Sequence, residues 1–327
     1  MTDNFYSRPP FYSDYVKKLC RLKQHYPFLK LFEAGRSIQG RKIHALFLGN
    51  CCRPVVYAAA FHAQEWLTEL LVLRFLEELC ELKKSRDEIC RALSVRGAVF
   101  VPLVNPDGVE LALSGGKSAS SLKGFTDKIS GGDYTSWQAN ARGVDINHNF
   151  DAGHALLRKM ETAAGITGPA PRQFGGLSPH SEPETKTLVH LCRRFEPSRV
   201  YAFHSQGEEI FYRYGSRLPA GSAAIARLLA DTSGYTLPVQ SGLASHGGFK
   251  DWFIKEMGRP GFTIEIGRGK NPLPINELSP IFATVYKGNI IKNLIMDCQS
   301  YTKYRPNETT GGIFVSWRRK EELPTGA

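Results

Sequence analysis

Two stretches of the sequence place a histidine at the end of an apolar run. In VVYAAAFHAQEW (residues 55–66), His62 and Glu65 follow the run, and in SRVYAFHSQGE (residues 198–208) His204 ends it. Ligands of open α/β sheets bind beyond the carboxyl ends of the strands. Two imidazoles and one carboxylate form a catalytic zinc set that leaves a fourth position for water. The sequence therefore predicts one Zn²⁺ ion held by His62, Glu65 and His204.

Each motif alone also has a structural interpretation. A glutamate in the first turn of a helix is favoured by the helix dipole, and a histidine at a strand end is common without any ligand. The presence of two such strand ends in one chain favours the metal site.

A carboxylate also interrupts the apolar segment TIEI. Glu265 is costly to bury there unless it has a partner or a task. It could form an ion pair in the core, with Arg268 as the partner. Beside a metal site, the favoured interpretation is a general base that takes a proton from the metal's water.

The segment ARGVDINHNFDAG (residues 141–153) contributes further polar groups. Asp145 is suited to accept a proton from a ligand histidine and so orient its ring. Asn147 and His148 offer donors to a substrate carboxylate. The alternative is a polar turn, where Asn and Asp are common for backbone reasons.

Short apolar strands alternate with helices along the chain. This order predicts an α/β fold with a parallel or mixed sheet covered on both faces. A segment rich in Gly, Ser and Lys, residues 113–140, reads as a surface excursion near a site. The expected strands are 43–48, 55–61, 98–104, 199–204 and 262–266, and the expected helices are 12–26, 66–84, 182–195, 221–232 and 276–300.

Length and composition fit one globular domain. The chain has 327 residues, of which 42% are apolar and 22% charged, and this usage argues against a disordered protein. We expect a single domain over residues 1–327, with a core from about 12 to 300 and less ordered ends. No run approaches the roughly 18 apolar residues of a membrane span. The first ten residues, MTDNFYSRPP, resemble no secretory signal, which favours a cytoplasmic protein.

The net charge of +11 favours anionic partners such as nucleic acid, anionic lipid or cell-wall polymer, or simply reflects a basic solvated surface. No nucleic-acid-binding motif accompanies the charge, so we expect no nucleic-acid partner. The seven cysteines contain no C-x-x-C pair, which is typical of reduced thiols in the cytoplasm.

Taken together, these stretches resemble the zinc carboxypeptidase family, the metallocarboxypeptidases related to pancreatic carboxypeptidase A. The resemblance implies a mixed, mostly parallel sheet of about eight strands between helices. It also implies that His62, Glu65 and His204 are the zinc ligands, that Glu265 is catalytic and that Asp145 braces a ligand histidine. The resemblance runs from about Tyr12 to about Ser300, with seven motifs in the family's order: SIQGRKIHALFLG, FHAQEW, NPDG, GVDINHNF, YAFHSQG, GGFKDW and TIEIG.

The chain departs from the digestive enzymes at three positions. Asn147–His148 stands where they carry an Asn–Arg pair that holds the substrate's terminal carboxylate. Their substrate-capping Tyr falls near Leu243, and their oxyanion-stabilising Arg falls near Gln138. Arg142 and Arg268 are the candidates to replace that last cation. An ordinary C-terminal exopeptidase with a hydrophobic or basic preference is therefore not expected.

The segments YPFL, GVDINHN, HSQGE and GGFKDWFI are similar to the bacterial γ-D-glutamyl-diamino acid peptidase branch, which cuts the γ-D-Glu to meso-diaminopimelate bond of cell-wall peptides. Lys250 occupies the position that in the family lines the floor of the pocket for the leaving residue. A cation there would favour the extra carboxylate of diaminopimelate, with His148 holding the α-carboxylate. The structural alternative for Lys250 is a surface lysine at a helix start.

The favoured hypothesis is thus a zinc peptidase that acts on a cell-wall peptide. A carboxypeptidase that removes acidic C-terminal residues would also suit Lys250. A non-catalytic module that binds cell wall is the third possibility, but it would have no use for the base Glu265.

Overall fold

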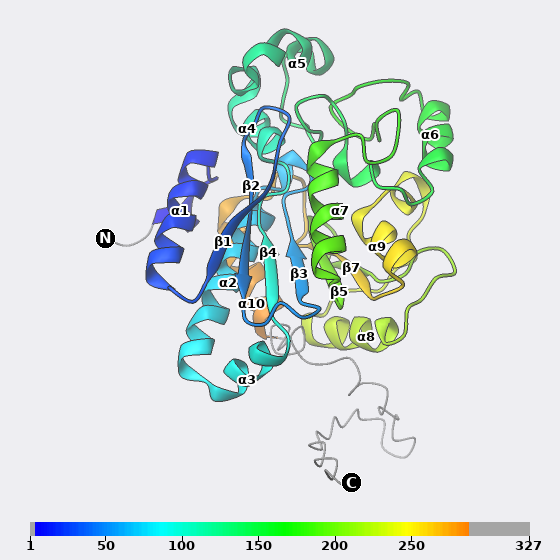
Figure 1. Cartoon of the computed structure of the whole chain (residues 1–327). Coiled ribbons are helices and arrows are strands. Elements are labelled where there is room, and N and C mark those ends of the chain that lie inside the picture. The colour runs from blue at the N-terminus through cyan, green and yellow to red at the C-terminus, as the bar shows by residue number, and fades with distance from the viewer. Residues whose placement is uncertain (1–3, 288–327) are drawn as a thin grey trace.

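The structure, a computed structural model, describes residues 4–287 (Figure 1). One seven-stranded sheet crosses the molecule in the order β1-β2-β4-β3-β5-β7-β6. The four central strands, β4, β3, β5 and β7, run parallel, and β1, β2 and β6 run antiparallel to their neighbours. The strands are β1 Lys30–Arg36, β2 Lys42–Leu48, β3 Val55–Ala58, β4 Ala98–Val101, β5 Arg199–Ser205, β6 Glu209–Phe211 and β7 Gly261–Ile266.

The predicted fold class, a single α/β domain with a mixed sheet, is confirmed, with seven strands in the described residues against about eight expected. The two edge strands β1 and β6 were not predicted. β1 contains Gly35 and only partly buried or exposed residues, and β6 has three residues, so neither shows a long apolar run. The predicted strand 55–61 ends early, at Ala58, because Ala60 has a positive φ of 51°. The backbone N–H of Ala60 donates to Thr68 Oγ1 instead of continuing the sheet.

The described residues contain ten α-helices, and five of them had not been predicted (α3, α4, α5, α6 and α9). The helix expected over 276–300 begins as a short 3₁₀ turn followed by α10, and its part beyond residue 287 lies outside the described residues. The helices are α1 Tyr12–His25, α2 Leu67–Ser85, α3 Asp87–Val95, α4 Pro106–Ser114, α5 Lys123–Ser130, α6 His154–Ala163, α7 Pro183–Phe195, α8 Ser222–Ser233, α9 Phe249–Met257 and α10 Leu278–Lys287.

The sheet separates two hydrophobic cores. Alternate residues of a strand face opposite sides, so Val55 and Tyr57 of β3 join one core while Val56 and Ala58 join the other. Helices α1, α2, α8 and α10 pack on the first core, and α7 and α9 pack on the second (Figure 1). Because both faces are covered, the carboxyl edge of the parallel strands is the natural place for a site.

The excursion over residues 113–140 is more ordered than the sequence suggested. It contains a 3₁₀ segment, Gly115–Leu122, and then α5. Tyr134 and Trp137 anchor its end in a third, smaller apolar cluster. The excursion is therefore a folded segment, and its last residues are held in place by this apolar cluster.

Two further expectations concern membrane-spanning helices and the state of the cysteines. Between residues 4 and 287, no helix is both long and apolar enough to cross a membrane. The six cysteines in that part of the chain are all free.

Candidate active site

Two neighbouring strands deliver the predicted metal ligands to the same edge of the sheet. After β3, the chain turns at Ala60 and enters a 3₁₀ turn, Ala63–Glu65, so that His62 and Glu65 stand just beyond the strand. His204 is the penultimate residue of β5, which pairs in parallel with β3. The stacking of the His204 ring on Phe61, with centroids 4.9 Å apart, fixes its orientation. The topology thus joins residues that are far apart in the sequence.

The three side chains form a compact group of possible ligands, His62, Glu65 and His204, whose donor atoms all lie within 4.8 Å of one another. The Nδ1 atoms of His62 and His204 are 3.3 Å apart. Glu65 offers one carboxylate oxygen to each ring, at 2.8 Å from His62 Nδ1 and 3.1 Å from His204 Nδ1. Two nitrogens and a carboxylate that converge in this way fit the donor set of a catalytic zinc ion.

The electrostatics of the ligand group also suit a cation. Burial alone would raise the pKa of Glu65, but His62 and His204 outweigh it and lower the pKa to about 2. Burial lowers the pKa of His204, which favours the neutral ring that a metal ligand requires, whereas Glu65 and Asp145 raise the pKa of His62 despite its burial. His204 points Nδ1 at His62 and Glu65, and its Nε2 has no hydrogen-bond partner in the described part of the chain.

Asp145 braces His62 from the side away from the ligand group. Its Oδ1 lies 3.2 Å from His62 Nε2. Burial alone would raise the pKa of Asp145, but the charges of His62 and His148 lower it strongly. Backbone N–H groups of Asn147 and Gln173 donate to the same carboxylate, at 3.1 and 3.2 Å. With Nε2 thus occupied, the lone pair of His62 Nδ1 is directed toward the metal position.

Glu265 stands beside the ligand group on the next strand. In the parallel pairing of β5 and β7, Glu265 lies directly opposite His204, and neighbouring strands are about 4.8 Å apart. Burial and the nearby Glu65 carboxylate raise the pKa of Glu265 well above its usual range, and Glu209, its partner on β6, raises it further. The site thus holds several acidic groups around two imidazoles, and a divalent cation would offset their repulsion.

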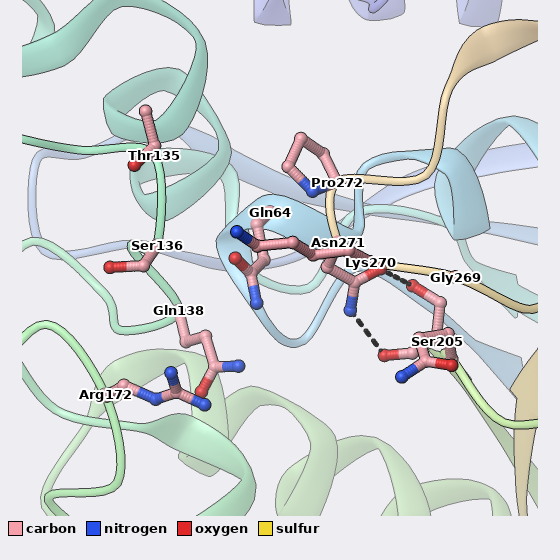
Figure 2. A pocket seen from close by; sticks show the side chains of 11 residues that line it. Gln64, Thr135, Ser136, Gln138, Arg172, Ser205, Gly269, Lys270, Asn271 and Pro272 are labelled. Atoms are coloured by element: carbon pink, nitrogen blue, oxygen red, sulfur yellow. Dashed lines mark hydrogen bonds between the residues drawn. The ribbon is translucent and has the colours of Figure 1, made fainter.

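A pocket of about 670 Å³ opens next to the ligand group (Figure 2). Gln64, which stands between the possible ligands His62 and Glu65, and Ser205, which follows His204, both line the pocket. In Figure 2 the end of the excursion and Arg172 lie on one side, and the loop after β7 lies on the other. The lining residues are Gln64, Thr135, Ser136, Gln138, Arg172, Ser205, Gln206, Gly269, Lys270, Asn271 and Pro272.

The family model described as zinc carboxypeptidase matches residues 15–287. The chain belongs to the zinc carboxypeptidase family. The family is zinc-dependent, and His62, Glu65 and His204 form a group that could hold the zinc ion.

Two relatives and one solved structure illustrate the match. The chain is 35% identical over 280 residues to Gamma-D-glutamyl-L-diamino acid endopeptidase 1 of Lysinibacillus sphaericus, covering 83% of this chain and 69% of that protein. It is 32% identical over 293 residues to the uncharacterized protein YqgT of Bacillus subtilis, covering 86% and 77%. The carboxypeptidase A of Helicoverpa armigera shares the fold, with a TM-score of 0.68 and 18% identity over 89% of this chain and 74% of that one. The chain is therefore a zinc metallopeptidase with a carboxypeptidase fold.

The structure brings only one of the predicted substrate-binding residues into this pocket. Gln138 lines it, but the two candidate replacements for the family's oxyanion cation are engaged elsewhere. Arg142 donates to both carboxylate oxygens of Glu182, and Arg268 is 79% exposed and paired with Glu208. Neither is among the residues that line the pocket.

The three residues predicted to hold the leaving residue lie outside the pocket. Asn147 accepts the backbone N–H of Phe249 at 3.0 Å and so caps the start of α9. His148 is buried, with Nδ1 3.2 Å from Glu161 Oε1. Burial alone would lower the pKa of His148, but Asp145 and Glu161 outweigh it and raise the pKa. A positive charge on the His148 ring would therefore already be balanced by a buried carboxylate.

Lys250 is buried and not a surface residue of the helix start. Only 1% of its side chain is exposed. Its Nζ donates to the carbonyl of Arg213 at 2.7 Å, to Gln240 Oε1 at 3.1 Å and to Asp251. A lysine ammonium has three donors, so every one of them is already in use, and its role toward a substrate stays a prediction.

The sequence did not single out the charged residues that line the pocket, Arg172 and Lys270. Arg172 lies in the loop segment PRQFGG, which carries no chemical motif, and Lys270 follows β7 in a glycine-rich loop. One signal was available: Gln64 stands between two predicted ligands, so its side chain had to lie near the metal position.

Proposed function

We propose that this zinc metallopeptidase hydrolyses the γ-D-glutamyl–meso-diaminopimelate bond of peptidoglycan peptides. The observation that carries the peptidase part is the convergence of His62, Glu65 and His204 on one point, with Glu265 opposite His204. The choice of bond is supported by the 35% identity to an enzyme named as a γ-D-glutamyl-L-diamino acid endopeptidase.

In this proposal His62, Glu65 and His204 hold a single zinc ion. Bound zinc supplies Lewis-acid chemistry, which polarises the scissile carbonyl and lowers the pKa of water to around 7. Glu265 accepts the proton of the attacking water and returns it to the leaving amine. The place of Glu265 opposite His204, beside the possible ligands, suits a group that takes up and returns this proton. Asp145 keeps His62 in the tautomer that can bind metal.

The runner-up is a metallocarboxypeptidase that removes acidic C-terminal residues from ordinary peptides. The fold shared with carboxypeptidase A is compatible with it. The 35% identity to an enzyme named as a γ-D-glutamyl-L-diamino acid endopeptidase favours the first proposal over this one.

The two activities are separated by one experiment. The purified protein, with zinc, is incubated with L-Ala-γ-D-Glu-meso-diaminopimelate and, separately, with an α-linked peptide that ends in glutamate, and the products are identified by mass spectrometry. We expect L-Ala-D-Glu and free diaminopimelate from the first and little cleavage of the second. Glu265→Gln and a chelator-treated sample are the controls and should both be inert. An intact tripeptide with rapid trimming of the α-linked peptide would favour the runner-up.

A further inference from the structure

The pocket beside the ligand group is positively charged. Of its lining residues, only Arg172 and Lys270 carry a formal charge, and both are cations. The others are neutral, and most of them are polar, such as Gln64, Gln138 and Asn271. Both cations are exposed, and within the described residues neither side chain forms an ion pair. The pocket is therefore built to receive an anionic group and contains no acid to neutralise it.

Arg172 is held in place from both sides. The carbonyl of the preceding Pro171 accepts the N–H groups of Gln138 and Ala139, at 2.8 and 3.0 Å. The following residue, Gln173, donates its N–H to Asp145, the carboxylate that braces His62. Gln173 has a φ of 65°, an uncommon conformation for a residue other than glycine. The backbone on which Arg172 stands is therefore tied to the metal site.

Lys270 is tied to the ligand strand β5 in a similar way. The next residue, Asn271, donates Nδ2–H to the carbonyl of Ser205 at 2.6 Å and accepts the Ser205 hydroxyl at 2.8 Å. Gly207 N–H also donates to the carbonyl of Gly267, at 2.8 Å. The loop that carries Lys270 is therefore fastened to the segment that follows His204. Arg172 lies on the side of the excursion, and the side chain of Lys270 extends from the loop after β7 toward Gln64 (Figure 2).

From this arrangement we propose that Arg172 and Lys270 bind the free carboxylate of the residue on the acyl side of the scissile bond. This inference rests on the proposed function. A γ-linked glutamyl residue keeps its α-carboxylate, a few bonds from the carbonyl that is attacked, whereas an α-linked residue has a free carboxylate at that distance only if its side chain is acidic. The residues predicted for the leaving side, His148 and Lys250, do not line this pocket, so the pocket is available to the acyl side.

The two cations would then select an acyl-side residue that has a free carboxylate, as a γ-linked glutamyl residue does. Arginine and lysine both form charge-assisted hydrogen bonds with carboxylates. Both side chains are solvated in the free protein, so substrate binding would exclude water from the pair as the carboxylate enters. Loss of one hydrogen bond to a charged group typically changes affinity or kcat/KM by about 10- to 100-fold.

The test compares two tripeptides that differ in a single group: L-Ala-γ-D-Glu-meso-diaminopimelate and its analogue in which the glutamyl α-carboxylate is a carboxamide. We expect kcat/KM of the zinc-loaded wild type to be about 10- to 100-fold lower for the amide. Arg172→Gln and Lys270→Gln should each lose activity on the acid but little on the amide, mainly through KM. Arg227→Gln on α8 removes an exposed charge away from the pocket and should behave as wild type.

The outcomes separate the inference from the function on which it rests. If the wild type cleaves neither tripeptide, the proposed function fails. If it cleaves both equally well, or if the variants keep the full preference for the acid, the carboxylate-binding role is wrong. An equal fall in kcat for both substrates in Arg172→Gln would also overturn it, because that result indicates stabilisation of the transition state and no contact with the carboxylate.

Discussion

The substitution Asp145→Asn tests how the protein prepares His62 to bind metal. The Asp145 carboxylate is 2% exposed and receives three donors: His62 Nε2, the Asn147 N–H and the Gln173 N–H. Asparagine fills the same volume but replaces one oxygen with an NH₂ group. At least one of the three donors then faces another donor, and the negative charge beside His62 is lost.

The size of the effect follows from these contacts. A buried donor left without an acceptor costs about 1–3 kcal/mol of stability. Removing a carboxylate that orients a ligand histidine typically weakens metal affinity by 10- to 100-fold. We therefore expect Asp145→Asn to lower the free energy of unfolding by about 1–3 kcal/mol and to weaken zinc binding by one to two orders of magnitude.

Zinc affinity is measured by competition with a chromophoric chelator, and stability by urea unfolding of the metal-free protein. Asp107→Asn is a matched control because Asp107 is fully buried and also receives three donors, Ser37 Oγ at 2.8 Å, Gln39 N at 2.8 Å and Arg41 Nη1 at 2.6 Å. It should cost similar stability with no change in zinc affinity. Unchanged zinc affinity in Asp145→Asn, or an equal loss in Asp107→Asn, would refute this reasoning.

Three other predictions follow from the site and its surroundings. Glu265→Gln should lower kcat by about 10²- to 10⁴-fold yet keep zinc in a metal analysis. Chelation should lower Tm in a thermal scan of the wild type, because the ligand group then keeps its crowded charges without a cation. Burial, together with Asp107 and Glu182, raises the pKa of Glu184 from 4.5 to about 8. The folded protein then binds a proton that the unfolded chain releases, so stability falls between about pH 4.5 and 8, by up to about 1.4 kcal/mol per unit, and Glu184→Gln should remove this slope in urea unfolding.

The sequence predicted the parts of the site that local patterns encode. His62 and His204 each follow a short buried strand, and parallel strands meet at one edge of the sheet, so their convergence could be expected. Glu265 was recognisable because a carboxylate in an apolar strand needs a partner or a task. The edge strand β1 gave no comparable signal, because its burial does not alternate and its pairing with β2 contains an irregularity near Gly35.

The residues that line the pocket could not be predicted, because their positions depend on contacts between distant segments. Arg172 lies at the pocket because the neighbouring Pro171 carbonyl accepts hydrogen bonds from the backbone N–H groups of Gln138 and Ala139. Arg142, which had seemed a suitable cation, is instead paired with Glu182, forty residues further along the chain. Nor could the sequence show that Lys250 is buried with three internal acceptors.

The metal content of the purified protein gives the most direct test of the active site. Native mass spectrometry of the wild type, of Glu65→Gln and of His204→Gln counts the zinc ions per folded chain, and circular dichroism confirms that each variant is folded. We predict about one tightly bound zinc in the wild type and its loss from both variants. A folded His204→Gln variant that retains its zinc in full, or a wild type that binds none, would contradict the assignment of His62, Glu65 and His204 as the ligands.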